Sequence, residues 1–369
     1  ALVSALTSKN ISVSLWGRGF VIDSFATVLV LGLFVFLVAS FAREQKRLVK
    51  LFLAAFSGTV ATVLLQVILY VSQRVPFVSK YLAHVANQGT LVGSWIDFAY
   101  FVTFTFILSL MMHEVLSPKG FFKNISLAAM SLSLIVLIFL NFTPAWIITI
   151  ISALLVFVYK SSVERSAITF FSRGGLADTS DAVEYPEARF PLASFIALLV
   201  GLFFLLSSAS IGARIAQFAG MNFSDIRPSF GTTMTVARST FVHDPVFGVG
   251  AGRFNNAWNL YHPAAINQTV FWNTPFDTGF SLLTTILVTN GVLVLLAVLA
   301  MFGFSLIQGF KLFNHQFPDR FSRFIAVTAL IMLIAFILLF TLASPGLVLV
   351  AYGFIYMGLL VGVSTLIGK

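Results

Sequence analysis

The chain contains no cysteine and few charged side chains among its 369 residues. Without cysteine there is no disulfide framework, no thiol chemistry and no zinc site built on cysteine ligands. Charged residues make up only 9% of the sequence, and the longest basic stretch is "REQKRLVK" at 43–50. The net charge of +9 therefore lacks the long basic tracts typical of nucleic-acid-binding proteins. We expect no nucleic acid among the partners of this chain.

Apolar residues make up most of the sequence: 59% are hydrophobic, 42 are phenylalanine, and the mean hydropathy is +0.98. A helix needs about 20 apolar residues to cross about 30 Å of hydrocarbon, and a backbone exposed to lipid must satisfy its own hydrogen bonds. The sequence therefore predicts an all-α, polytopic membrane protein with about nine transmembrane helices. The apolar runs lie near 20–42, 51–72, 95–112, 125–142, 144–160, 191–210, 280–309, 324–343 and 346–367.

Two of these runs are irregular. Only "NFTPA" separates 125–142 from 144–160, which predicts either a tight hairpin or two short helices that do not both cross fully. The run 280–309 is too long for one upright span, and Asn290 and Gly291 interrupt it, so we expect a short helix before the true crossing. The chain starts at Ala1 without a cleavable-signal layout, and we expect natural residues upstream of it.

The basic residues predict an orientation. Loops on one side carry 14 of the 22 Lys and Arg, and the short links "NFTPA" and "ASPG" on the other side carry none. Cytoplasmic loops are enriched in basic residues, so the first side is expected in the cytoplasm of a bacterium. The chain then divides into N-terminal helices at 1–210, one large extracytoplasmic loop at 211–279 and C-terminal helices at 280–369. The cytoplasmic segment 160–190 is expected to be a solvated linker.

The large loop contains four arginines and no lysine. Arginine presents a planar fork of donors that binds phosphate oxygens in a bidentate way, which suits a diphosphate on a lipid carrier. For any single arginine, snorkelling at the interface or pairing with Asp225 or Asp244 explains its presence equally well. The arginines are Arg214, Arg227, Arg238 and Arg253.

The stretch "GVGAG" places Gly248, Gly250 and Gly252 directly before an arginine. Glycines let backbone amides approach an anion closely, as phosphate nests do, although a plain tight turn explains the pattern equally well. The stretch lacks the GK[ST] ending of a nucleotide-binding loop, and we expect no cofactor.

Candidate acids and bases of the loop are His243, His262 and Asp277. A histidine could accept a proton from a sugar hydroxyl, and a carboxylate could do the same. The alternatives are hydrogen-bonded structural histidines and an aspartate that caps a helix. Neither the spacing of the histidines nor a carboxylate cluster fits a metal site, so we expect no metal.

Aromatic side chains of the loop could stack on sugar rings, and interfacial belts of membrane proteins use the same residue types. The candidates for sugar stacking are Trp258, Tyr261 and Trp272.

Five stretches resemble the O-antigen ligase and polymerase family of bacterial membrane glycosyltransferases. "DPVFGVGAGRF" at 244–254 resembles the family's "(N/H)PLxGxGxGxF" signature, and "RPSFGTTMTVARSTF" from Arg227 resembles its Arg-led segment. "GTLVGSWIDFAYF" at 89–101 is similar to "GTxGNxNxxAxYL", and "SVSLWGRG" at 12–19 to "SxWGxxxR". "LVTNGVLVLLAVL" at 287–299 is similar to "LxExGLLGLLLxL".

The resemblance implies a metal-independent transfer of a glycan from a polyprenyl-diphosphate carrier to a glycan, lipid or protein acceptor. It matches Arg227 to an arginine that holds the diphosphate, whereas Arg238 and Arg253 are supported by chemistry and nearness alone. The chain departs from the family at two places. Phe280 and Ser281 stand where the ligases carry an acceptor-activating His-Asn pair, and Thr289 replaces the acidic residue. Either another group such as Asp277 or His262 activates the acceptor, or the chain is a divergent member with altered or absent ligase activity.

Two other classes of function stay open. A non-catalytic scaffold of a polysaccharide assembly system fits the missing His-Asn pair. A transporter of lipid-linked glycans would show internal repeats and buried charges, and the sequence has neither an internal repeat nor more than one broken helix.

Overall fold

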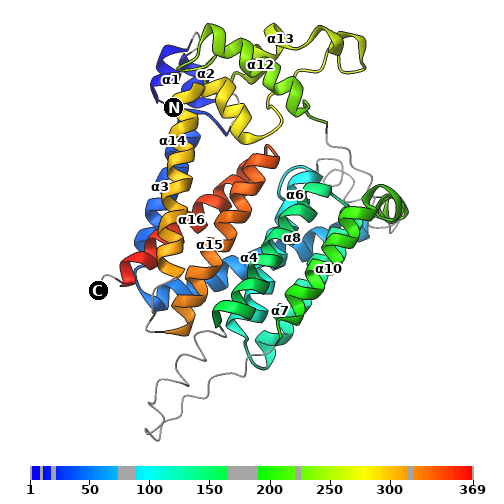
Figure 1. The fold of residues 1–369 in the computed structure, drawn as a ribbon, viewed down its shortest axis with the longest axis vertical. Helices are drawn as coiled ribbons and strands as arrows, with labels where there is room; N and C mark the ends of the chain where they lie inside the picture. Colours follow the sequence, from blue (N-terminus) through cyan, green and yellow to red (C-terminus); the bar gives the residue numbers. More distant parts are fainter. Residues whose placement is uncertain are drawn as a thin grey trace, which may run out of the picture. The chain divides into compact units, whose positions relative to one another are not determined.

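The structure is a computed structural model that describes residues 2–8, 11–17, 22–73, 89–164, 190–220, 226–313, 317 and 319–367. The regular elements of these residues are all helices (Figure 1). Contacts divide the chain into two compact units, unit 1 (1–53, 69–100 and 223–369) and unit 2 (54–68 and 101–222). This division differs from the three consecutive parts expected from the sequence, because the N-terminal residues pack with the chain after 223.

Each of the nine predicted spans coincides with a helix among the described residues. Eight of the helical stretches are long and apolar enough to cross a membrane, so the chain is a multi-pass membrane protein. The first predicted span is the shorter helix α3 (Phe25–Phe41), with 17 residues. The eight stretches are Gln45–Ser72 (α4), Trp95–Leu116 (α6 and a π-helical turn), Phe121–Leu140 (α7), Thr143–Ser161 (α8 and part of a π-helical turn), Leu192–Phe218 (α10 to α11), Leu282–Phe313 (α14), Arg320–Leu342 (α15) and Leu347–Thr365 (α16).

Unit 2 contains the hairpin of α7 and α8. Asn141 ends α7 in the left-handed conformation (φ 44°), and α8 begins at Thr143, so the connection is a tight turn between two full-length helices. The side-chain amide of Asn141 donates to the carbonyl of Ser208 at 3.0 Å. Ser208 starts the π-helical turn that joins α10 (Leu192–Ser207) to α11 (Ala213–Ala219). The expected start of the loop at residue 211 is therefore wrong, because the helix continues to Ala219.

In unit 1, α3 and α16 (Leu347–Ile367) run in the same direction and pack closely. Their contact uses small residues: a Cβ atom added at Gly358 would meet Val38, and one added at Gly362 would meet Ala42. Phe302 of α14 and Phe340 of α15 pack with ring centroids 5.8 Å apart. These contacts are of the kind that helix association in lipid requires, because lipid supplies no hydrophobic driving force between helices.

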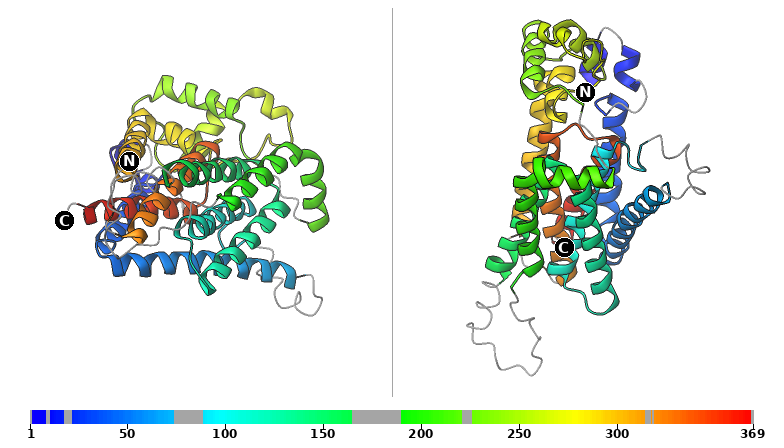
Figure 2. Two further views of the ribbon diagram at one scale, coloured as in Figure 1. Left: turned by 60° about the horizontal axis from the view of Figure 1, so that its bottom comes forward. Right: turned by 90° about the vertical axis from the view of Figure 1, so that its right-hand side faces the viewer.

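Four short helices gather at one end of α14: α1 (Leu2–Thr7), α2 (Ile11–Trp16), α12 (Phe230–His243) and α13 (Phe254–Tyr261) (Figures 1 and 2). None of these four helices is long and apolar enough to cross a membrane. The chain from 226 to 281, which we call the polar segment, therefore forms its own helical layer on this end of unit 1.

Helix α14 is broken at Gly291, as the sequence predicted. Gly291 has φ 77° and ψ −179°, a conformation that residues with a Cβ atom avoid. The glycine-rich residues 245–252 lie against this break: the amides of Val249 and Gly250 donate to the carbonyls of Val288 and Thr289 at 3.1 and 2.9 Å. The break thus frees helix carbonyls, and the polar segment satisfies them.

We expect Gly291→Ala to destabilise the protein. Its added Cβ atom would collide with the carbonyl of Val246, and the positive φ would add about 1–3 kcal/mol of strain. The matched control is Gly303→Ala, because Gly303 lies in the same helix with nothing within 4 Å of an added Cβ atom. Thermal unfolding in detergent should show a lower midpoint for Gly291→Ala and an equal or higher one for Gly303→Ala. Equal losses in both variants would contradict the packing described for the break.

Candidate functional site

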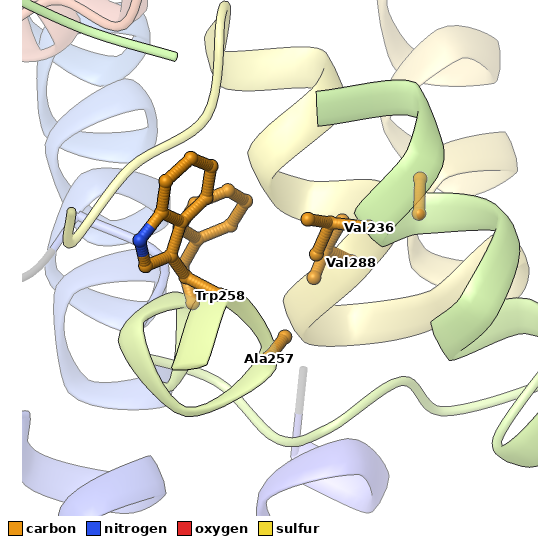
Figure 3. Packing of buried hydrophobic residues seen from close by; sticks show 6 residues of the cluster. Val236, Ala257, Trp258 and Val288 are labelled. Carbon is orange, nitrogen blue, oxygen red and sulfur yellow. The ribbon is translucent and has the colours of Figure 1, made fainter. Parts of the chain in front are cut away.

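The polar segment is held together by a small apolar core between α12, α13 and α14. Val236 of α12 faces Val288 of α14, and Ala257 and Trp258 of α13 complete the contact (Figure 3). Ser229 caps α12 by accepting a hydrogen bond from the amide of Thr232 at 3.2 Å. The segment therefore has a fixed conformation on which polar side chains can be placed.

The aromatic candidates for sugar stacking have different environments. Trp258 is only 3% exposed, stacks on the ring of His262 and meets the ring of Phe276 edge-on at 4.8 Å. It is a core residue, which corrects the sugar-stacking prediction for this position. Tyr261 is half-buried and stacks on the ring of His243 at 5.5 Å. Trp272 is 64% exposed, so its ring remains accessible.

The glycines of "GVGAG" serve packing. The amides of Gly248 and Gly252 donate to Asp244 O at 3.1 Å and to Asp23 Oδ2 at 3.0 Å. Gly250 lies against Ser8 and Ser14, where an added Cβ atom would be 2.6 Å from Ser8. Because these amides, and those of Val249 and Gly250, already donate to protein oxygens, the geometry gives the glycines a packing role in place of the expected anion nest.

Arg227 lies where the polar segment meets the ends of α14 and α15. Its Nη1 donates to the carbonyls of Phe280 and Leu342, the latter at 2.7 Å. Its guanidinium also stacks over the ring of Phe280, 4.5 Å from the centroid. Thr233 of α12 accepts a hydrogen bond from the amide of Phe280 at 3.0 Å. Arg227 is thus a tether between three parts of the chain as well as a cation at their junction.

The other two arginines are in different surroundings. Arg253 is half-buried and donates from Nη1 to the carbonyl of Val249 at 3.2 Å. With the amide of Asn256 turned to face it, Arg253 also donates from Nη2 to that oxygen at 2.6 Å. Arg238 is exposed on α12. Neither Arg238 nor Arg253 forms an ion pair with a described carboxylate.

The two histidines differ in the nitrogens they leave accessible. The Nδ1 atom of His262 lies 2.8 Å from Trp258 O and its Nε2 atom lies 2.9 Å from Asn267 Oδ1, so both nitrogens have protein partners. His243 is exposed, and its Nδ1 atom lies 2.9 Å from Ser239 O. A proton on Nδ1 of His243 leaves the lone pair of Nε2 directed away from this bond.

Asp277 is exposed, and its Oδ1 atom accepts a hydrogen bond from Asn255 Nδ2 at 3.4 Å. Asn255 in turn accepts from Asn259 at 2.9 Å. These two amides lie on one face of α13, which turns toward the strip of chain before α14. The carboxylate is held on one side and accessible on the other.

Two of the candidates are thus connected to one short strip, residues 277–280, one as a member of it and one through a hydrogen bond. Arg227 binds Phe280, and Asp277 lies three residues before it. Arg227 and Arg253 donate to different backbone carbonyls, those of Phe280 and Leu342 for Arg227 and that of Val249 for Arg253. Sequence reasoning missed the roles of Phe280 and Asn255, because a phenylalanine and an asparagine carry no signal without their partners.

The chain matches no protein-family model, and no curated protein is similar to it.

The two tryptophans of the site give a test of this geometry. Trp258→Ala should destabilise the protein by about 3–5 kcal/mol, because it removes a buried aromatic side chain from the core. Trp272→Ala should change the unfolding midpoint little, because its ring is mostly exposed. Thermal unfolding of both variants in the same detergent would reveal the difference. A larger loss for Trp272→Ala would overturn the description of the core.

Proposed function

We propose that the protein transfers a glycan from a polyprenyl-diphosphate carrier to an acceptor hydroxyl at the outer face of a bacterial cytoplasmic membrane. The observation that carries the proposal is the strip 277–280. It presents an accessible carboxylate at Asp277 and binds the guanidinium of Arg227 at Phe280. A cation for the leaving diphosphate and a base for the acceptor are the two groups that this reaction requires.

The depth of the strip in the membrane supports a lipid-linked substrate. Helix α15 has 23 residues and is about 35 Å long at about 1.5 Å per residue, close to the hydrocarbon thickness of about 30 Å. Its last residue, Leu342, therefore lies near a membrane boundary. Arg227 donates to Leu342, so its guanidinium lies at the level where lipid phosphates are found.

The arginines are proposed to act on the diphosphate. Arg227 and the exposed Arg238 would bind its oxygens, and Arg253 would add to the positive field from the start of α13. During transfer the acceptor oxygen forms a bond to the anomeric carbon while the bond to the carrier diphosphate breaks, with inversion. The guanidinium groups stabilise the charge that grows on the leaving diphosphate.

Asp277 is proposed to receive the proton of the acceptor hydroxyl. Phe280 and Ser281 occupy the positions of the His-Asn pair in the ligases that the sequence resembles, and Ser281 is buried. Asp277 lies three residues before Phe280 in the sequence, and its side chain is exposed. His243, with its Nε2 lone pair, is the second candidate base, whereas both ring nitrogens of His262 have protein partners.

Arg238→Ala gives the cleanest test of diphosphate binding. Because Arg238 is exposed and has no ion pair with a described carboxylate, its loss should leave the unfolding midpoint unchanged. Transfer from a polyprenyl-diphosphate glycan by purified protein should fall about 10- to 100-fold in kcat/KM, the value of a charge-assisted hydrogen bond. Arg238→Lys should recover part of it. Unchanged transfer in Arg238→Ala would remove this residue from the site.

Arg227→Ala is expected to abolish transfer and also to lower the unfolding midpoint, because it removes bonds to Phe280 and Leu342. Arg227→Lys keeps the charge, loses the bidentate fork and separates the two effects.

Asp277→Asn tests the base. The amide keeps the shape and the contact with Asn255 but cannot accept a proton, so kcat should fall about 10²- to 10⁴-fold with an unchanged KM for the carrier. His243→Asn in the same assay examines the second candidate. Two results would favour the non-catalytic scaffold over the transferase. In one, all arginine and acid variants transfer sugar like the unaltered protein; in the other, the unaltered protein transfers none.

A further inference from the structure

A buried carboxyl group lies at the junction between the N-terminal residues and the polar segment. Asp23 is 7% exposed and precedes α3, with Ser24 as the cap of that helix. Its Oδ2 atom accepts a hydrogen bond from the amide of Gly252, 229 residues away, at 3.0 Å. The side chain of Thr289, next to the break of α14, is also close enough to Asp23 to influence its pKa. One carboxyl group therefore touches three distant parts of the chain.

The neighbouring serines show that this junction is built from polar contacts. The hydroxyl of Ser4 donates to Phe247 O at 2.8 Å, and that of Ser14 donates to Ala251 O at 3.0 Å. Both serines are buried. The N-terminal helices thus hold the glycine-rich residues 245–252 through two of their backbone carbonyls.

The hydrogen bonds around Thr289 favour a neutral carboxylic acid at Asp23. The single hydroxyl proton of Thr289 is donated to the carbonyl of Thr285 at 2.9 Å, and its oxygen also accepts from the amide of Asn290 at 2.9 Å. A protonated Asp23 can donate to Thr289 without disturbing either bond, whereas an ionised Asp23 would need the proton that Thr285 receives.

The charges around Asp23 agree with this assignment. The described residues of α1, α2, α3 and the stretches 245–252 and 282–291 contain no titratable side chain. Arg253 donates to Val249 and Asn256, while Lys9 and Arg18 lie outside the described residues. Burial raises the pKa of Asp23 above its usual value of 3.8, and this effect outweighs the opposing effects of the nearby Thr289 side chain and the Gly252 amide.

We propose that Asp23 is a positioning residue that, as a neutral acid, holds Gly252 and the following Arg253 against the broken end of α14. Arg253 depends on this contact because its Nη1 atom donates to Val249, inside the same glycine-rich stretch. The consequence for transfer rests on the function proposed above, whereas the consequence for structure does not.

The test compares Asp23→Asn with Asp23→Ala in the full chain, purified in lipid nanodiscs. Asparagine keeps both contacts, since its oxygen accepts from Gly252 and its amide donates to Thr289, so it should unfold and exchange like the unaltered protein at acidic pH. Asp23→Ala loses both contacts, and hydrogen exchange in the peptide 246–254 should become about tenfold faster. Asp244→Asn, which changes an exposed carboxyl, is the control.

The pH dependence separates a neutral from an ionised Asp23. Since the pKa of Asp23 is raised in the folded protein, its contribution to stability is complete below the usual pKa and is lost as the pH rises through the raised value. The unfolding midpoint of the unaltered protein should therefore fall with rising pH more steeply than that of Asp23→Asn. Asp244→Asn should retain the steeper fall.

Two results would overturn the proposal: Asp23→Asn as damaging as Asp23→Ala, or Asp23→Asn with the same pH dependence as the unaltered protein. If Asp23→Ala does not fold, the comparison of Asp23→Asn with the unaltered protein still decides. In the transfer assay, Asp23→Asn should keep and Asp23→Ala should lose activity. If the unaltered protein shows no transfer, the proposed function fails, while exchange and pH dependence still decide the role of Asp23.

Discussion

The contact between the glycine-rich residues 245–252 and the break of α14 is the constraint on which the rest of the site depends. Gly291 opens the helix, and the amides of Val249 and Gly250 bind the carbonyls of Val288 and Thr289. A side chain at Gly248 would lie 2.5 Å from Val288 O, so the two backbones approach each other as closely as glycine allows. From this contact follow the position of α13, the small core around Trp258 and the direction in which the strip 277–280 enters α14.

The carbonyl groups at the end of a membrane helix need hydrogen-bond donors, and at the end of α15 other parts of the chain supply them. At the end of α15, Arg227 supplies Leu342 with a donor, and the amide of Leu282 supplies Ala343 at 2.8 Å. Gly346, after the same link, donates to Asp97 Oδ1 at 2.7 Å. A cation and a carboxylate thus satisfy opposite ends of one short link.

Much of the fold could be predicted from the sequence because lipid permits few solutions. Apolar runs of the right length located the eight described helical stretches that can cross a membrane and the shorter helix α3, and Asn290 and Gly291 marked the break in α14. The tight hairpin at Asn141 could not be separated from two partial crossings, since "NFTPA" fits both. The start of the polar segment was placed too early because Gly212 and Arg214 look like a helix end, although the helix continues through them.

The candidate site was harder to predict from the sequence than the fold, because the roles of its residues depend on contacts with distant parts of the chain. Tryptophan serves equally well in a core and against a sugar, and burial by distant helices decides for Trp258. A glycine-rich stretch has the same sequence pattern whether it binds an anion or packs against a helix. Here the contact with the break of α14 at Gly291 gives the stretch a packing role. Nothing near Asp23 in sequence points to its contact with Gly252, 229 residues away. Nothing in the Arg-led stretch points to the bonds that Arg227 forms with the distant backbone carbonyls of Phe280 and Leu342.

The short helix α3 has a consequence for the surrounding bilayer. Its 17 residues extend about 26 Å, several ångströms less than the hydrocarbon thickness, and it packs beside α16 in unit 1. Lipid next to α3 must thin or the helix must draw headgroups inward, at a modest cost per ångström. Any thinning of this kind is local to α3, because α16 beside it has 21 residues.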